Sequence, residues 1–300
     1  MITPKYLKSG DCVGIIASAR KITHKEIKPA IDKFNEWGLE VVLGNNIFEI
    51  SDQFAGNDMQ RTEDFQNMIN NNNVKAVIVA RGGYGTVRII DKIDFTNFIK
   101  NPKWILGYSD VTVLHSHIHN NFGVETIHST MPLNFPHNGV NNNSLITLKN
   151  ALFGEKLDYN IGSKSYNKSG YAAAVLTGGN LSMLYALSAT PSDIDTNGKI
   201  LFIEDLDEYL YHIDRMMMQL KRSGKLEKLA GLIVGGMTEM RDNTIPFGKT
   251  ACQIIAEAVK DYNYPVCYDF PAGHIDDNRA LILGRNVKLN VSETYVELEF

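Results

Sequence analysis

Short apolar runs alternate with longer amphipathic runs along the first half of the chain. The apolar runs predict buried strands at residues 13–17, 39–43, 74–80 and 104–107. The amphipathic runs predict helices at residues 25–37, 61–69 and 111–120. Strands that are apolar throughout are buried on both faces, so this alternation predicts a parallel sheet with helices on either side.

The pattern changes after about residue 136, where Asn, Gly, Ser and Lys become frequent and the periodicity fades. One helix is expected there, over residues 144–152, with Ser144 as its N-cap. Beyond it the chain predicts two helices and seven short strands. The helices are expected at 211–223 and 250–262, and the strands at 171–176, 199–203, 231–235, 265–270, 280–283, 287–291 and 294–300. The last two strands alternate apolar and polar residues with period two, which is typical of an antiparallel pair.

These patterns predict an α/β protein of two domains. Residues 1–150 are expected to form an N-terminal α/β domain with a parallel sheet, and residues 151–169 a linker. Residues 170–300 are expected to form a C-terminal, β-rich α+β domain.

Composition and charge exclude several classes of protein. A chain of 300 residues that is 44% hydrophobic and 21% charged is neither a disordered protein nor a disulfide scaffold. Its net charge of −4 gives no electrostatic reason to expect nucleic acid or an anionic membrane as a partner. No apolar stretch approaches the ~20 residues that a membrane span requires. The three cysteines include no CxxC pair and are expected to be reduced, which favours a cytoplasmic location.

A glycine-rich segment, Arg81-Gly-Gly-Tyr-Gly85, follows the strongest of the predicted strands. Its GGxG spacing matches neither the GxGxxG dinucleotide motif nor the GxxxxGK[ST] phosphate loop, so a dinucleotide site is the weaker interpretation. Glycines at the carboxyl end of a strand can instead expose backbone N–H groups to a developing oxyanion.

Ser109 lies where the apolar strand 104–107 meets the helical segment 111–120. A serine in such a strand–turn–helix position presents its hydroxyl beside the positive end of a helix, as hydrolase nucleophiles do. Helix capping by Ser109 or Asp110 is the commoner use of these residue types and stays open as an alternative. The GxSxG consensus of α/β-hydrolases is absent, because the chain reads Gly-Tyr-Ser-Asp-Val here.

A serine nucleophile needs a base and a group that orients the base. His274 lies in a loop with Pro and Gly that follows a predicted strand, a frequent place for catalytic side chains. Glu204 emerges directly from an apolar strand, where a carboxylate is costly to bury unless it is paired. Alternatively, Glu204 belongs to the acidic start of helix 211–223 together with the carboxylates that follow it.

The histidines His115, His117 and His119 form an HxHxH pattern that would suggest a metal site on a strand. On a helix only His115 and His119 share a face, and no cluster of carboxylates or cysteines accompanies them. Packed or exposed helix histidines are therefore the favoured interpretation, and no metal or other cofactor is expected. His128 and His137 are reserve candidates for a catalytic base.

Taken together, these segments resemble the LD-carboxypeptidase family of serine peptidases, which includes the microcin-immunity peptidases. The resemblance covers nearly the whole chain and rests on five blocks in the family's order. They are RGGYGTVRIID at 81–91, PKWILGYSDVT at 102–112, LTGGNLSML at 176–184, ILFIEDLDEYLYHIDRMMMQL at 200–220 and DFPAGHIDDNRALILG at 269–284.

The resemblance implies a role for each matching residue. The serine of the GYSD motif, Ser109, is the nucleophile, and the histidine of the GHxxxN motif, His274, is the general base and later the general acid. The glutamate of the FIED motif, Glu204, orients the imidazole. Backbone N–H groups of Gly83 and Asp110 form the oxyanion hole.

The resemblance also implies the substrate and the assembly. Members hydrolyse the L,D-peptide bond of cytoplasmic muropeptide tetrapeptides and release the terminal D-alanine for recycling of peptidoglycan. A homodimer that carries Ser109 on its N-terminal domain, and Glu204 and His274 on its C-terminal domain, is expected. An arginine is the natural partner of the substrate's terminal carboxylate. The candidates are Arg81, Arg88, Arg215, Arg241 and Arg279.

Two other functions compete with this one. A microcin-type amide hydrolase acting on an aminoacyl-nucleotide conjugate would need an aromatic surface on which the base can stack. Trp37 and Trp104 are the only tryptophans, and Trp104 is expected to be buried in a strand. A non-catalytic ligand-binding protein with two domains would need no triad and would be indifferent to Ser109→Ala.

Overall fold

The computed structural model describes residues 1–300 and holds two β-sheets. The first sheet has six strands, five of which are parallel to one another. The five parallel strands are β1 (Cys12–Ile16), β2 (Glu40–Leu43), β3 (Val74–Val79), β4 (Trp104–Gly107) and β5 (Thr126–His128). The sixth strand, β11 (Leu281–Leu283), is antiparallel to β5. The spatial order of the six strands is β11-β5-β4-β3-β1-β2, which confirms the predicted parallel sheet of four strands and adds two. The added strands are β5, which was not predicted, and the edge strand β11, which was expected at residues 280–283 of the C-terminal domain.

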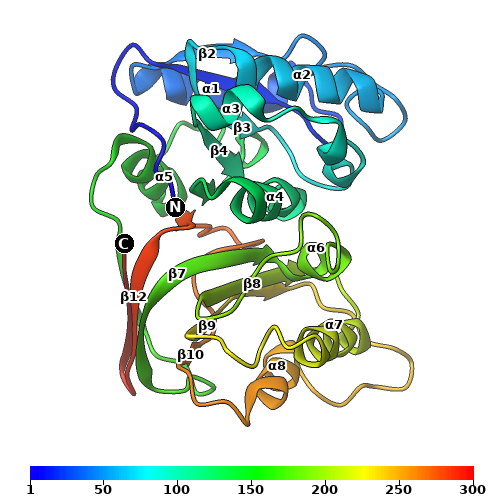
Figure 1. The fold of residues 1–300 in the computed structure, drawn as a ribbon, viewed down its shortest axis with the longest axis vertical. Helices are drawn as coiled ribbons and strands as arrows, with labels where there is room; N and C mark the ends of the chain where they lie inside the picture. The colour runs from blue at the N-terminus through cyan, green and yellow to red at the C-terminus, as the bar shows by residue number, and fades with distance from the viewer.

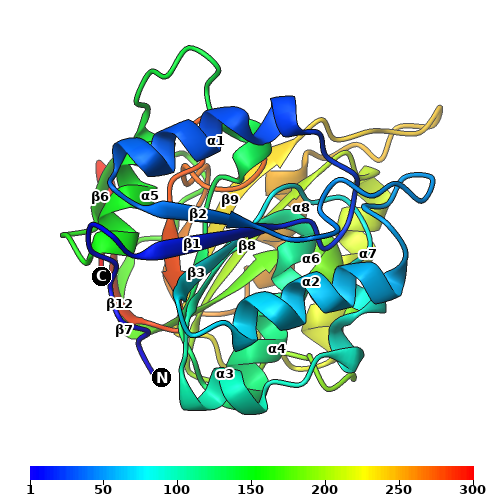
Figure 2. The ribbon, with the colours of Figure 1, turned by 90° about the horizontal axis from the view of Figure 1, so that it is seen from above.

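Helices cover both faces of this sheet, as its apolar strands predicted. Figure 2 shows α1 (His24–Glu36) on one side of the sheet and α2 (Asp58–Asn70) on the other. Successive residues of a strand point to opposite faces. Val13 and Ile15 of β1 therefore share a buried cluster with α1, whereas Ile16 shares one with α2.

The second sheet has seven strands in the order β10-β9-β8-β7-β12-β13-β6. Their bounds are β6 (Asp158–Gly162), β7 (Gly170–Asn180), β8 (Ile200–Leu206), β9 (Gly231–Thr238), β10 (Val266–Cys267), β12 (Asn286–Val291) and β13 (Tyr295–Glu299). The run from β10 to β7 is parallel, and the run from β7 to β6 is antiparallel. The antiparallel pair predicted from the period-two alternation is confirmed in β12 and β13.

Three helices accompany the second sheet. They are α6 (Leu181–Ala186), α7 (Leu210–Arg222) and α8 (Ala251–Val259). Buried side chains of α7, among them Ile213 and Met217, pack with Ile254 of α8 and with Leu201 of β8 in one apolar cluster. The two helices therefore close the face of the sheet that Leu201 occupies.

The segment between the sheets departs from the sequence prediction in its details. The helix there is α5 (Asn143–Phe153), and Asn142 caps it by accepting from the Leu145 N–H, so the prediction of Ser144 as the cap is wrong. Ser144 lies inside the helix and donates to the Asp276 carbonyl instead. The expected linker, residues 151–169, contains the edge strand β6, and β11 crosses to the first sheet. The division at residues 150 and 170 stays a prediction.

Helix α4 (Thr112–Phe122) lies between the two sheets in Figure 1, and its first residue ties them together. The Thr112 hydroxyl accepts a hydrogen bond of 2.9 Å from the backbone N–H of Asn180, at the end of β7. Gly179 permits this approach, because a Cβ there would lie 2.5 Å from the Thr112 hydroxyl oxygen. This contact fixes the position of the segment that follows β4 relative to the carboxyl end of β7.

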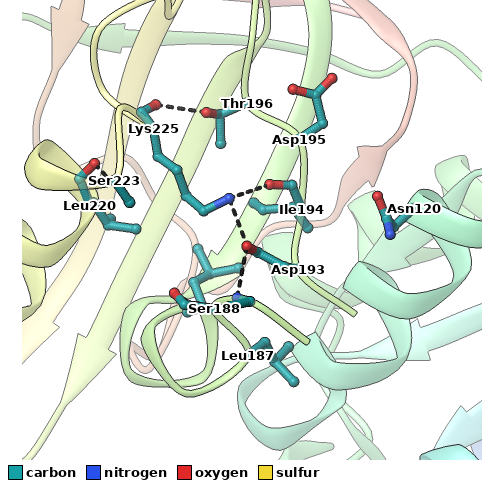
Figure 3. Close-up of polar contacts among 12 residues, drawn as sticks. Asn120, Leu187, Ser188, Asp193, Ile194, Asp195, Thr196, Leu220, Ser223 and Lys225 are labelled. Atoms are coloured by element: carbon teal, nitrogen blue, oxygen red, sulfur yellow. Dashed lines mark hydrogen bonds and ion pairs between the residues drawn. The ribbon is translucent and has the colours of Figure 1, made fainter. Parts of the chain in front are cut away.

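A second tie, shown in Figure 3, anchors the loop that joins α6 to β8. The Lys225 ammonium donates to the Ile194 carbonyl at 2.7 Å and pairs with Asp193 at 2.8 Å. Thr196 donates back to the Lys225 carbonyl at 2.7 Å. Asn120 of α4 donates to the Pro191 carbonyl of the same loop at 3.0 Å. The loop therefore bridges α4 and the segment that follows α7.

Two further expectations concern the chain as a whole. None of its helices combines the length and the apolar character that a membrane crossing would need. All three cysteines are unpaired, in agreement with the expectation that they are reduced, and Cys12 and Cys267 are buried.

Candidate active site

Ser109 occupies the tight turn that the sequence predicted. Strand β4 ends at Gly107, Tyr108 is extended, and Ser109 opens a single 3-10 turn, Ser109–Val111, that runs into α4. The φ angle of Ser109 is +64°, a left-handed conformation that costs a non-glycine residue ~1–3 kcal/mol. Its hydroxyl caps neither turn nor helix, so the capping alternative is wrong for Ser109.

The glycine-rich loop after β3 lies against this turn. A Cβ on Gly82 would be only 3.0 Å from the Cβ and 3.2 Å from the hydroxyl oxygen of Ser109, so glycine permits the contact. Gly83 follows with a φ angle of +118°, and its N–H donates to no backbone carbonyl. The Asp110 N–H lies in the first helical turn, where backbone donors have no intrahelical acceptor. Both N–H groups are therefore available to a ligand beside Ser109.

The side chain of Asp110 connects the loop to the turn. It is 1% exposed, and its Oδ2 accepts a hydrogen bond of 2.8 Å from the Thr86 N–H. Burial raises the pKa of this carboxyl, while hydrogen bonds with Thr86 and the Gly85 N–H act in the opposite direction. Sequence reasoning considered the Asp110 backbone and a helix cap, and it missed this contact with the loop.

Removal of the Asp110 carboxylate is expected to loosen the glycine loop. A displacement of about 1 Å in an active site can cost about 10²-fold in rate, so we expect Asp110→Ala to lower kcat by up to that factor. KM should change little, and Asp110→Asn should recover most of the rate because its Oδ1 can still accept from Thr86. Steady-state kinetics on the three proteins tests this expectation. A parental kcat in Asp110→Ala would contradict it.

The buried carboxylate of Glu204 pairs with His274, whose side chain is partly exposed. The Glu204 Oε2 lies 2.7 Å from the His274 Nδ1 and also accepts from the His274 backbone N–H at 3.2 Å. Glu204 is 0% exposed, whereas the His274 side chain is 13% exposed. The pairing of β8 with β9 is irregular around Glu204, and such bulges redirect side chains. The structure thus confirms that Glu204 has the partner its burial demands.

Glu204 is separate from the acidic residues that follow it. Asp207 pairs with Arg241 at 2.5 Å, and Glu208 pairs with His212 at 2.6 Å on the first turn of α7. The alternative that grouped Glu204 with the start of that helix is therefore wrong.

The loop that carries His274 passes directly over Glu204. Gly273, with a φ angle of +111°, makes this possible, because a Cβ there would lie 2.7 Å from the Glu204 Oε2. Asn278 Oδ1 accepts from the Gly273 N–H at 2.9 Å and from the fully buried His128 at 3.1 Å. Sequence reasoning kept His128 only in reserve and gave Asn278 no role, although the GHxxxN motif contained the signal.

The ionisation of the pair follows from its surroundings. Burial by itself would raise the pKa of Glu204, but the hydrogen bond and charge of His274, with the charge of His128, lower it below its ordinary value. Burial by itself would lower the pKa of His274, but the hydrogen bond and charge of Glu204 raise it above 6.5. The pair therefore consists of a carboxylate and an imidazole of increased basicity.

His274 lies beside the serine turn. Its ring centroid is 4.7 Å from that of Tyr108, the residue before Ser109. A polar cavity of about 220 Å³ opens next to these residues. Its lining includes Tyr108, Thr130, Asn134, Ile275 and Asn278. The glycine loop therefore lies against the serine turn, and the serine turn lies against His274 of the Glu204–His274 pair.

The five candidate arginines differ in whether the guanidinium group already has an ion-pair partner in this chain. Three of them already pair with aspartates, namely Arg88 with Asp58, Arg241 with Asp207 and Arg279 with Asp277. Arg215 lies over the ring of Tyr211. Arg81 directly precedes the glycines beside Ser109, and its nearest carboxylate oxygen, on Glu26, is 3.9 Å away.

The HxHxH histidines lie on α4, each with its own hydrogen-bond partner. His115 contacts the Gly107 carbonyl, His117 the Ser192 hydroxyl and His119 the Thr126 hydroxyl, all at 2.9 Å. Burial lowers the pKa of His115 and of His119 to about 3, so both rings are neutral. The predicted packing role is confirmed. The other reserve candidate, His137, is exposed.

Comparison with known proteins decides the family. Models of the LD-carboxypeptidase N-terminal and C-terminal domains match residues 13–129 and 173–289. The chain belongs to the LD-carboxypeptidase family. It is 36% identical to a probable murein peptide carboxypeptidase of Bacillus subtilis, over 99% of this chain and 94% of that protein. It is 26% identical to the murein tetrapeptide carboxypeptidase of Pseudomonas aeruginosa, over 92% of each chain.

Solved structures give the same result for the fold of this LD-carboxypeptidase family member. The crystal structure of muramoyltetrapeptide carboxypeptidase from Oxalobacter formigenes superposes with a TM-score of 0.87 at 28% identity, over 96% of this chain and 97% of that one. The wild-type microcin C7 self immunity protein MccF superposes with a TM-score of 0.87 at 19% identity, over 100% of this chain and 99% of that one. The resemblance and the two-part α/β fold expected from the sequence are confirmed.

Proposed function

We propose that this protein is a serine-type LD-carboxypeptidase that releases terminal D-alanine from muropeptide tetrapeptides. The observation that carries the proposal is Ser109, held in a left-handed turn next to Tyr108, whose ring lies against His274 of the Glu204–His274 pair. Such a turn, with a histidine oriented by a carboxylate, is the arrangement that activates a serine hydroxyl. Relatives named murein peptide and murein tetrapeptide carboxypeptidases support the choice of substrate.

In the proposed mechanism, the Ser109 hydroxyl attacks the carbonyl of the bond before the terminal D-alanine. His274 Nε2 accepts the proton, because Nδ1 is engaged with Glu204. The N–H groups of Gly83 and Asp110 stabilise the oxyanion, and His274 then protonates the departing amine. Water, deprotonated by the same histidine, hydrolyses the acyl-enzyme and regenerates Ser109.

The chain also offers groups for recognition of the substrate. Among the candidate arginines we propose Arg81 for the terminal carboxylate, because it lies beside the glycine loop and has no closer ion pair than 3.9 Å. The polar cavity next to Tyr108 is suited to the stem peptide, whose amides need hydrogen-bond partners.

The microcin-type alternative has less support. The likeness to MccF, at 19% identity, concerns the fold alone. Trp104 is 0% exposed at the start of β4, and its Nε1 donates to the Lys5 carbonyl, so it offers no surface to a nucleobase. The non-catalytic alternative leaves the pairing of the buried Glu204 with His274 without a purpose.

The setting of the enzyme is part of the same proposal. We propose that it acts as a homodimer in the cytoplasm, in the recycling of peptidoglycan fragments. The chain lacks a helix that could cross a membrane, which is compatible with this setting. Sedimentation velocity on the purified protein measures the oligomeric state directly.

Mass spectrometry of a purified muramoyl tetrapeptide incubated with the protein tests the proposed function. We expect the loss of one D-alanine and no further shortening. The control substrate is the same tetrapeptide with a terminal L-alanine, which should stay intact because the proposed site accepts an L,D-bond. If both tetrapeptides survive, the substrate assignment fails, and an aminoacyl-nucleotide conjugate becomes the next substrate to incubate.

A further inference from the structure

A cavity of about 500 Å³ opens beside the N-terminal ends of strands β3 and β4 of the first sheet. Three segments line it: the N-terminal residues 2–5, the turn before β3, and the turn between α3 (Thr96–Lys100) and β4. Ser109 lies beyond the other end of β4. Ser109 lies six positions after Lys103 along a nearly extended chain, a distance of about 20 Å. The cavity is therefore distinct from the candidate active site.

Four lysines line this cavity, namely Lys5, Lys75, Lys100 and Lys103. The ammonium groups of Lys75 and Lys103 donate to the backbone carbonyls of Asn72 and Asn71. None of the four forms an ion pair with a carboxylate, and no aspartate or glutamate is among the lining residues. Like charges gathered without a counter-ion repel one another, and this repulsion favours the binding of an anion.

Lys103 is a buried positive charge in the lining of this cavity that has no carboxylate partner. It is 3% exposed, although lysine is almost never buried without a charged partner. Burial, followed by the charge of Lys75, lowers its pKa to about 8. A bound anion would supply the missing opposite charge and favour the ammonium form.

The walls of the cavity are fixed before any ligand arrives. The N-terminal residues pair with the first sheet, since the Ile2 N–H donates to Gly123 and the Ile2 carbonyl accepts from Glu125. Trp104 donates to the Lys5 carbonyl at 3.1 Å. The volume lies within the range of about 300–1,000 Å³ that is typical of small-molecule sites.

We propose that this cavity binds a small molecule that carries a diphosphate group. Four lysines in the lining of one cavity favour a ligand with several negative charges in a compact group, and lysine is a common partner of phosphate. The apolar part of the lining, Ile2 and Val74 with Pro4 and Pro102, is suited to an organic moiety attached to the diphosphate. This site does not depend on the function proposed for Ser109.

Isothermal titration calorimetry of the full chain with inorganic pyrophosphate and, separately, with ADP tests the proposal. Both are expected to bind at low salt, and pyrophosphate should displace ADP. The variant Lys75→Gln/Lys100→Gln loses two positive charges from partly or fully exposed positions, so its fold should be preserved. We expect it to bind each probe about tenfold or more weakly, since contacts between ammonium and phosphate are charge-assisted. Tighter binding of ADP than of pyrophosphate would show that the apolar lining contributes.

The matched control is Lys25→Gln/Lys228→Gln, which removes the same charge from two exposed lysines outside the cavity. It should bind both probes as the parent does, and a thermal melt of each variant reports on its fold. Equal binding by the parent and the cavity variant would overturn the proposal. So would equal weakening in the cavity variant and the control, because only the overall charge would then matter. The proposal would also be overturned if neither pyrophosphate nor ADP binds the parent at millimolar concentration.

Discussion

Replacement of Ser109 by alanine is expected to lower kcat/KM for the tetrapeptide by about 10⁴-fold or more. The hydroxyl oxygen of Ser109 is the atom that would form the acyl-enzyme, and no other hydroxyl or thiol lies on the turn Ser109–Val111 that follows β4. The N–H groups of Gly83 and Asp110 remain in the variant, so a small residual rate above that of water is expected. Release of D-alanine, followed by mass spectrometry under single-turnover conditions, measures the effect.

The control for this variant is Ser116→Ala. Ser116 lies on α4, is buried, and its hydroxyl has no hydrogen-bond partner, so the change removes an equivalent hydroxyl outside the site. Its kcat/KM should stay near that of the parent. Appreciable turnover by Ser109→Ala, with Ser116→Ala unchanged, would show that another group attacks the carbonyl.

The strands and helices of the first sheet were predictable because each has a strong and simple pattern. Val74–Val79 is apolar and β-branched, and His24–Glu36 carries a capping box between Thr23 and Glu26. The serine turn was predictable for a similar reason, since an apolar strand runs directly into a helical segment. Local sequence thus determines these elements and the position of the serine turn. The left-handed φ angle of Ser109 was not predicted, because such a conformation persists only where the surrounding structure imposes it.

Other features depend on contacts between distant residues, which the local pattern does not reveal. The strand β11 was expected at residues 280–283, but its pairing with β5, more than 150 positions earlier in the chain, was not. The hydrogen bond between Asp110 and Thr86 joins two loops that follow different strands. His128 reads as a residue of irregular sequence, yet its burial against Asn278 places it next to the loop of His274. Tertiary packing decides each of these.

The Glu204–His274 pairing lies between these two cases. The chemistry of a carboxylate on an apolar strand predicts that Glu204 has a partner, and the family motifs name His274. The geometry that joins them requires the irregular pairing around Glu204 and the positive φ angle of Gly273, neither of which a residue pattern reveals. His274 could therefore be predicted as the partner of Glu204, whereas the backbone geometry that brings the two side chains together could not.

Replacement of Glu204 by glutamine is expected to reduce kcat and to shift the pH profile. In the parent, Glu204 raises the pKa of His274 above 6.5, so the acid limb of kcat/KM should lie above pH 6.5, with activity rising as His274 loses its proton. In Glu204→Gln the carboxylate charge is gone and burial dominates, so the limb should move to lower pH. The rate at the plateau should fall by about 10⁴-fold, the cost of the corresponding change in a serine protease.

Glu208→Gln is a matched control, because Glu208 also pairs with a histidine, at 2.6 Å from His212, but outside the site. Its profile should follow that of the parent. An acid limb that stays in place in Glu204→Gln would mean that another group titrates there and that His274 is not the base. A shifted limb with an unchanged plateau rate would mean that Glu204 tunes the pKa of His274 without orienting its ring. Only the combination of a shifted limb and a lowered plateau supports both roles, because the carboxylate would then hold the imidazole in place and stabilise its protonated form.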